Sequence, residues 1–173
     1  MNSIITQSQR PSLRSLGGSM ELKHAEEIAG EIIQALQPHC QKIEVAGSIR
    51  RKKPYVHDID IVLVPANQGA LLVALNALGS RVKEGPAIMQ RQYKGVMVDF
   101  YFATPETWYT LLLIRTGSKE HNIRLTTLAK RRGWHLHASG KGLTNEQGER
   151  LAGESEESFF AALGIPFVAT ERI

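Results

Sequence analysis

The first periodic stretch of apolar residues has the spacing of a helix. Apolar side chains recur every three or four positions from Leu22 to Leu36, and this pattern predicts an amphipathic helix. Ser19 is placed to cap its start, and Pro38 to end it. Residues 1–19 show no such periodicity, and we interpret them as a flexible tail.

The next part of the chain has the alternation that is typical of a half-buried sheet. We expect strands over residues 42–46 and 58–64, a helix over 70–78, and a hairpin of strands 87–93 and 96–102 that turns at Lys94-Gly95. The order helix, strand, strand, helix, strand, strand indicates a small mixed sheet backed by helices, an α+β fold.

The pattern changes after Pro105. We expect helices over residues 106–114 and 118–131 on either side of a Thr116-Gly117-Ser118 turn, short strands over 134–138 and 141–143, a hairpin at Gln147-Gly148, and a last helix from the cap Ser155 to Leu163. The change predicts that the chain divides into a segment of residues 20–104 and a C-terminal lobe of residues 105–173.

Composition narrows the class of protein. The chain has 173 residues, of which 42% are hydrophobic, and no apolar run approaches the length of a membrane span, so we expect no membrane partner. The start has no apolar signal segment. The only cysteine, Cys40, excludes an intramolecular disulfide and a Cys-rich zinc site, and it favours a reducing compartment such as the cytoplasm.

The positive charge is concentrated in the middle of the chain. The net charge is +4, but residues 42–141 carry 16 basic and 7 acidic side chains, against net values of −1 before and −4 after them. This distribution favours a surface that meets phosphate. A solvated basic face explains the charge equally well.

Three aspartates are the first candidates for chemistry. Asp58 and Asp60 alternate on one predicted strand and therefore share a face, where a hard divalent cation can neutralise them. Alone, such a pair can also simply face solvent. Asp99 lies on another predicted strand, and if the two strands are neighbours the three carboxylates converge. That arrangement fits a pair of Mg²⁺ ions of the kind that promotes phosphoryl transfer.

A short polar segment precedes these carboxylates. In Gly47-Ser48-Ile49-Arg50-Arg51 the glycine lets backbone amides approach an anion, the serine adds a hydroxyl, and Arg51 offers a fork of donors that matches phosphate. Its place before the aspartates indicates a triphosphate site. As a bare run, Arg50 to Lys53 would more often be a solvated face.

Together these segments resemble the DNA polymerase X family, which belongs to the polymerase-beta-type nucleotidyltransferases. The Gly47–Arg51 segment followed by Asp58-Ile59-Asp60 is similar to the broader signature. Thr116-Gly117-Ser118-Lys119-Glu120-His121-Asn122 is similar to the narrower family motif, and Gly153–Ser158 followed by Ala162–Pro166 is similar to its closing segment. The resemblance covers roughly residues 20–170. It implies a catalytic palm over residues 20–104 and a nucleotide-selection lobe, called thumb or fingers, over 105–173.

The resemblance also implies a role for each matching residue. Asp58, Asp60 and Asp99 would be the catalytic carboxylates and hold two Mg²⁺ ions, for which Mn²⁺ can substitute. The nucleotide dNTP would contact Gly47, Ser48, Arg51, His57, Thr116, Gly117, Lys119 and Asn122, with Ile114 and Arg115 beside its sugar. DNA would contact Arg50, Lys52, Lys53, Thr126, Lys130 and Arg131.

The sequence departs from the family pattern at several positions. His57 replaces a glycine before Asp58, Met97 replaces a basic residue two positions before Asp99, and Ile114-Arg115 replaces Tyr-Phe. The last change removes an aromatic wall beside the nucleotide sugar, so we expect weaker exclusion of ribonucleotides. We expect Arg115 to contact phosphate or an acidic neighbour such as Glu106 or Glu120.

We therefore expect a minimal, monomeric, template-dependent DNA polymerase that fills short gaps in primer-template DNA during repair. We expect no amino-terminal lyase domain and no phosphoesterase domain, so DNA binding should be weak and distributive. One alternative is a nucleotidyltransferase on the same fold that works without a template or modifies a protein or small molecule. A DNA-binding module without catalysis is the other.

Overall fold

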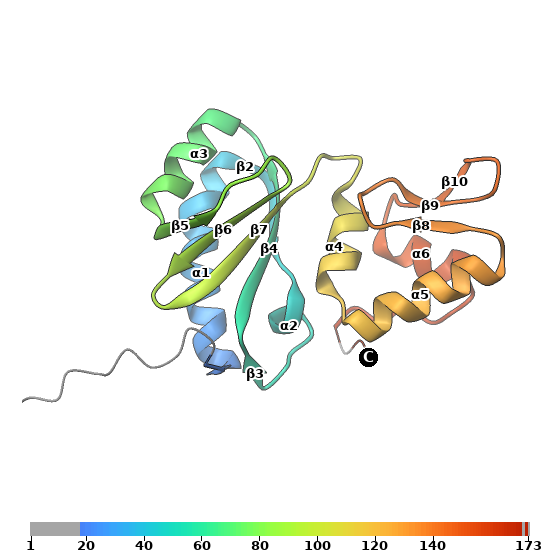
Figure 1. Cartoon of the computed structure of the whole chain (residues 1–173), viewed down its shortest axis with the longest axis horizontal. Coiled ribbons are helices and arrows are strands. Elements are labelled where there is room, and N and C mark those ends of the chain that lie inside the picture. The colour runs from blue at the N-terminus through green and yellow to red at the C-terminus, as the bar shows by residue number, and fades with distance from the viewer. Residues whose placement is uncertain (1–17, 171, 173) are drawn as a thin grey trace, which may run out of the picture.

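The structure is a computed structural model, and it describes residues 18–170 and residue 172. Its elements form two groups, one around a five-stranded sheet and one around a three-stranded sheet, as Figure 1 shows. The predicted tail lies outside the described residues except for Gly18 and Ser19. None of the described helices has the length and apolar character needed to cross a membrane.

The larger sheet is mixed, as predicted. Its strand order is β2-β4-β7-β6-β5, and only the central pair of β4 and β7 is parallel. The strands span β2 (Cys40–Val45), β4 (Asp58–Pro65), β5 (Ser80–Lys83), β6 (Ile88–Tyr93) and β7 (Val96–Phe102). Strand β5 was not predicted, because all four of its side chains are exposed and it has no apolar alternation.

Two helices cover one face of this sheet. They are α1 (Leu22–Leu36) and α3 (Gln68–Ala77), and their apolar side chains pack with those of β4 and β7 in one core cluster. A 3₁₀ turn (Gln37–His39) that contains Pro38 follows α1, so the helix ends where predicted. Helix α3 begins earlier than expected because the Asn67 side chain accepts a hydrogen bond from the Ala70 amide.

The predicted cap at Ser19 is wrong. Glu21 occupies the cap position of α1 and makes no side-chain cap bond. The reason is that Met20 and Glu21 form a short strand, β1 (Met20–Glu21), which pairs with β3 (Tyr55–Val56) and moves the start of the helix to Leu22.

The second group contains three helices and an antiparallel sheet. These are α4 (Trp108–Thr116), α5 (Lys119–Arg131), α6 (Glu156–Leu163), β8 (His135–His137), β9 (Gly142–Thr144) and β10 (Arg150–Ala152). The cap predicted at Ser155 is confirmed, because Ser155 accepts a bond from the Ser158 amide, and Ser118 caps α5 in the same way by accepting one from the His121 amide. These elements enclose their own core, which includes Leu113, Leu125, Phe159 and Phe160.

Helix α4 packs on both groups. Trp108, Leu111 and Leu112 pack against Val62 and Val64 of β4, on the sheet face opposite α1 and α3. Leu113 belongs to the core of the second group. Because α4 is shared between the two cores, the division of the chain at residues 104 and 105 stays a prediction.

Candidate active site

The three predicted carboxylates lie on the two parallel strands at the centre of the sheet. In the β4–β7 register Asp60 stands opposite Asp99, and Asp58 stands opposite Met97. The intervening residues, such as Ile59 and Val98, are buried in the core under α1 and α3. The aspartates therefore lie on the other face of the sheet, which looks toward α4 and α5 (Figure 1).

Two of the carboxylates are held by neighbouring side chains. The Tyr101 hydroxyl donates a hydrogen bond to Asp60 Oδ1 at 3.1 Å, and the Gln90 amide donates one to Asp99 Oδ1 at 2.6 Å. Gly47 packs directly over Asp60, because a Cβ at residue 47 would lie 1.9 Å from Asp60 Oδ2. Gly47 also has a φ of +59°, so only glycine fits here without strain.

Burial makes this group of carboxylates electrostatically costly. Burial and the nearby charge of Asp58 raise the pKa of Asp60 to about 6, although the Tyr101 hydrogen bond acts in the opposite direction. The pKa of Asp99 is also raised, mainly by burial, and the Gln90 hydrogen bond again opposes the rise. A bound cation would remove this cost by neutralising the charges.

The donor set suits a hard divalent cation, but the side chains are not gathered around a single point. Within residues 18–170 and 172, no three His, Cys, Asp or Glu side chains are arranged to hold a metal ion. The described hydrogen bonds engage Oδ1 of Asp60 and of Asp99 and leave each Oδ2 available as a ligand. Carboxylate oxygens are the ligands that Mg²⁺ prefers, so the residues present fit the predicted ion.

A cleft of about 490 Å³ opens between the sheet and the second group of elements. Of the predicted site residues, those that line it are Gly47, Ser48, Arg51, Asp58, Asp60, Ile114, Arg115, Gly117, Lys119, Asn122 and Thr126. Tyr101, Ile123 and Ala138 line it as well and were not predicted. The sequence pattern could have indicated Tyr101, because it lies on the same face of its strand as Asp99.

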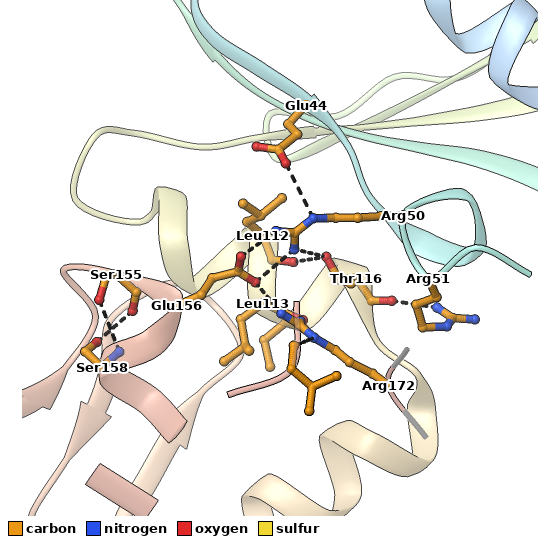
Figure 2. A network of polar contacts seen from close by, with 12 residues as sticks. Glu44, Arg50, Arg51, Leu112, Leu113, Thr116, Ser155, Glu156, Ser158 and Arg172 are labelled. Atoms are coloured by element: carbon orange, nitrogen blue, oxygen red, sulfur yellow. Dashed lines mark hydrogen bonds and ion pairs between the residues drawn. The ribbon is translucent and has the colours of Figure 1, made fainter. Parts of the chain in front are cut away.

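The turn between α4 and α5 forms one wall of the cleft. Gly117 has a φ of +65°, and a Cβ there would lie 3.1 Å from a terminal nitrogen of Arg51. That guanidinium donates a hydrogen bond to the Thr116 carbonyl at 2.6 Å, as Figure 2 shows. The contact fixes Arg51 beside the turn while the side chain still lines the cleft.

Two predicted contacts are corrected by a buried polar network (Figure 2). Arg50, which was predicted to contact DNA, donates to Thr116 Oγ1 at 2.8 Å and to both carboxylate oxygens of Glu156 at 2.9 and 2.6 Å. Its side chain is only 15% exposed and is bonded within the protein, so it does not face DNA. Thr116, predicted to contact the nucleotide, is fully buried, and its hydroxyl donates to the Leu112 carbonyl.

The same network includes a residue close to the end of the described chain. Arg172 donates to Glu156 Oε1 at 2.8 Å and is 2% exposed. Glu44 of β2 lies 3.4 Å from the Arg50 Nε. The cluster therefore joins the large sheet, α4, α6 and Arg172 around one buried glutamate.

The residues predicted beside the sugar make contacts within the protein. The Asn122 amide donates to the Ile114 carbonyl at 2.8 Å, which holds that carbonyl at the edge of the cleft. Among the described contacts Arg115 makes no ion pair with Glu106 or Glu120, although its charge acts on Asp60 and Asp99, and its contact with phosphate stays a prediction. Its guanidinium stacks on the Tyr101 ring instead, 4.1 Å from the ring centroid.

The remaining predicted residues do not line the cleft. His57 is exposed and lines a neighbouring cavity of about 430 Å³ together with Asp58 and Met97. Lys52 is bonded to Glu26 at 2.7 Å. The other predicted DNA contacts, Lys53, Lys130 and Arg131, are exposed.

Comparison with known proteins gives a consistent result. The family model of the DNA polymerase beta thumb matches residues 111–172. A relative from Bacillus subtilis (strain 168), DNA polymerase/3'-5' exonuclease PolX, is 34% identical over 157 residues. The match covers 86% of this chain and 27% of the relative, so the chain spans about a quarter of the length of that protein.

Two solved structures of polymerase beta from Leishmania infantum share the fold. One, a ternary P/T complex, has a TM-score of 0.75 at 19% identity and covers 89% of this chain and 76% of its own. The other, a ternary gap complex, has a TM-score of 0.76 at 18% identity and covers 89% of this chain and 70% of its own. The predicted palm and thumb architecture is therefore confirmed at the level of the fold.

Proposed function

We propose that the chain is a template-dependent DNA polymerase of the X family, a proposal that the matches to PolX and to the polymerase beta thumb support. It would join a dNMP to the 3′-hydroxyl of a primer. The reaction would take place in the cleft that is lined by Asp58, Asp60, Arg51 and Gly117. One observation carries the proposal: carboxylates and a guanidinium line the same cleft. Asp58 and Asp60 of β4 line the same cleft as Gly117 and as Arg51, whose guanidinium is bonded to the turn at Thr116, whereas Asp99 of β7 is not among the residues that line it.

The chemistry requires binding and orientation more than proton transfer. The primer hydroxyl attacks the α-phosphate of the dNTP, an ester bond forms, and pyrophosphate leaves. Asp58, Asp60 and Asp99 would hold two Mg²⁺ ions, or Mn²⁺ in their place, which when bound neutralise the charge of the attacking and leaving oxygens. Ser48 and Arg51 would bind the outer phosphates, and catalysis would rest on this positioning.

The α4–α5 turn would receive the nucleoside. A side chain at residue 117 would press on Arg51. Glycine avoids this contact, and the space that it leaves in the cleft would receive the sugar. The carbonyl of Ile114, fixed by Asn122, would stand at the sugar edge. Lys119 and Thr126 line the cleft from α5; Lys119 would contact the nucleotide, and Thr126, whose hydroxyl donates to carbonyls of its own helix, would meet the template as an acceptor.

Exposed cations outside the cleft suit the DNA backbone. Lys53, Lys130 and Arg131 are the predicted contacts that remain exposed without a described ion pair. We propose gapped or primer-template duplex as the substrate, short-gap repair as the setting, and a monomer as the working form. The reducing, cytoplasmic compartment that the single cysteine favours is part of the same proposal.

The test is primer extension with Mg²⁺ on three DNA substrates. These are a duplex with a one-nucleotide gap, an open primer-template, and a single-stranded primer, with Asp99→Ala as the inactive control. The proposal expects insertion of the complementary dNMP on the first two. Extension of the single strand with any dNTP would identify a template-independent transferase instead. DNA binding without any extension would identify a binding module.

A further inference from the structure

A row of polar residues crosses the large sheet at the level of the carboxylates. Asp60 of β4 stands opposite Asp99 of β7, Asp99 stands opposite Gln90 of β6, and Gln90 stands opposite Lys83 of β5. Residues paired in this way on neighbouring strands point to the same face and can interact. The row therefore extends the acidic site toward the β5 edge of the sheet.

Within this row, Gln90 makes a short hydrogen bond with Asp99. Its Nε2 lies 2.6 Å from Asp99 Oδ1, and both side chains are only partly exposed. A carboxylate offers only acceptors, so the amide must present its NH₂ group to it. The hydrogen bond engages Oδ1 of Asp99 and restricts the orientation of the carboxylate.

No side chain beside Asp99 on its own strand is free to donate a hydrogen bond to it. Met97 and Tyr101 share its face, but the thioether of Met97 has no donor, and the Tyr101 hydroxyl is bonded to Asp60. Asp58 and Asp60 repel Asp99, and burial disfavours its charge. The positive charges of Arg115 and Lys83 favour the ionised form of Asp99, but neither side chain makes a described hydrogen bond to it, so Gln90 is its described side-chain hydrogen-bond partner.

We propose that Gln90 is a positioning residue, which holds Oδ1 of Asp99 so that Oδ2 faces the metal and the primer hydroxyl. The role in catalysis rests on the proposed function, whereas the role in metal binding does not. Groups that hydrogen-bond a metal ligand typically change metal affinity or activity by about 10- to 100-fold when they are removed.

The test compares Gln90→Met with Gln92→Met. Both replace a glutamine on β6 by an unbranched side chain without a donor, and the two positions share a face of the strand. Among the described contacts, Gln92 makes no side-chain hydrogen bond. It therefore controls for the loss of a polar side chain from the strand.

The first readout is the binding of Mn²⁺ alone, followed by the electron paramagnetic resonance signal of the free ion. Gln90→Met should weaken binding by about 10-fold or more, and Gln92→Met by less than about twofold. The second readout is single-nucleotide gap filling. Gln90→Met should lower kcat by a similar factor and leave the KM for dNTP within about threefold, because the groups that bind phosphate are untouched.

The outcomes separate this inference from the proposed function. Weaker Mn²⁺ binding by Gln90→Met in a chain that extends no primer would support the positioning role and overturn the polymerase. Equal Mn²⁺ affinity in the natural chain and Gln90→Met would overturn the positioning role, whatever the activity. The same conclusion would follow if the natural chain bound no Mn²⁺, or if only the KM for dNTP changed.

Discussion

Asp60 combines burial with a proposed role, metal binding, that needs its charge. It lies under Gly47, receives a hydrogen bond from Tyr101, and has a pKa of about 6. The folded chain therefore binds the Asp60 proton more tightly than the unfolded chain does. Ionisation of this side chain costs folding free energy, and a bound cation recovers it.

This shift predicts a pH dependence of stability. Since the pKa is raised, the unfolded chain loses the proton first, and the free energy of unfolding falls as pH rises from about 4 to about 6. Asp60→Asn removes the titration. In chelator, its stability relative to the natural chain should rise over this window by on the order of 1–3 kcal/mol. Urea unfolding at several pH values measures the difference, and parallel profiles would contradict the assignment.

A second prediction concerns Asp99. Asp99→Ala should abolish primer extension and leave dNTP binding largely intact, because Asp58 and Asp60 can still hold the ion that accompanies the nucleotide. Equilibrium binding of a fluorescent dNTP and single-turnover extension measure the two effects separately. Near-normal extension by the variant would remove Asp99 from the site.

At the scale of elements, the segment from α4 to α5 is the most informative. The sequence predicted the turn between the two helices, and the structure agrees, adding that Ser118 caps α5 and that Gly117 has a φ of +65°. It did not predict that Arg115 stacks on Tyr101. That contact joins residues 14 apart in the sequence on a strand and a helix, and no local pattern encodes it.

The replacement of Tyr-Phe by Ile114-Arg115 remains the basis of a specificity prediction. The Ile114 carbonyl is held by Asn122, but neither residue 114 nor residue 115 supplies an aromatic ring. A double variant with Ile114→Tyr and Arg115→Phe should therefore prefer dNTP over rNTP more strongly than the natural chain. The ratio of incorporation efficiencies measures this. An equal or higher ratio in the natural chain would leave the backbone carbonyl as the only gate.

The network around Glu156 links elements that are far apart in the sequence. Burial alone would raise the pKa of Glu156, but hydrogen bonds from Arg50 and Arg172 hold it below its ordinary value. From the sequence, Arg50 belonged to a basic run and looked free for DNA. Only the fold brings a glutamate 106 residues away within bonding distance of it.

Glu156→Ala tests the energetic importance of this network. It leaves Arg50 and Arg172 buried without their shared counter-charge, so we expect a loss of about 3–5 kcal/mol in unfolding free energy. Glu157→Ala, an exposed change on the same helix, should stay within about 0.5 kcal/mol. Denaturant titration of both proteins measures this. Similar stabilities would mean that the network contributes little.

For the whole molecule, the sequence predicted the two groups of elements and most of their strands and helices. Periodicity was sufficient where one face is buried, as in α1, β4 and β7. It failed for β5, whose side chains are all exposed, and for β1 and β3, which are two residues long. The approximate site followed from motif spacing, but the partners of each side chain depended on contacts between distant segments.

The basic middle of the chain predicts the ionic behaviour of DNA binding. With Lys53, Lys130 and Arg131 exposed, the logarithm of the affinity should fall steeply with the logarithm of the salt concentration. Lys130→Ala with Arg131→Ala should make the slope shallower by about 0.9 for each phosphate that these side chains no longer neutralise. Fluorescence anisotropy with labelled primer-template measures both slopes. A flat dependence would exclude a phosphate-dominated interface.

The parallel pairing of β4 with β7 has a consequence for synthesis on the ribosome. Parallel neighbours need a long connection, and here α3, β5 and β6 all lie between them in the chain. Asp58 and Asp60 therefore leave the exit tunnel well before Asp99, and the nascent sheet lacks its central partner until β7 emerges. During that interval the chain carries Asp58 and Asp60 without Asp99, so the proposed site is incomplete until β7 has paired with β4.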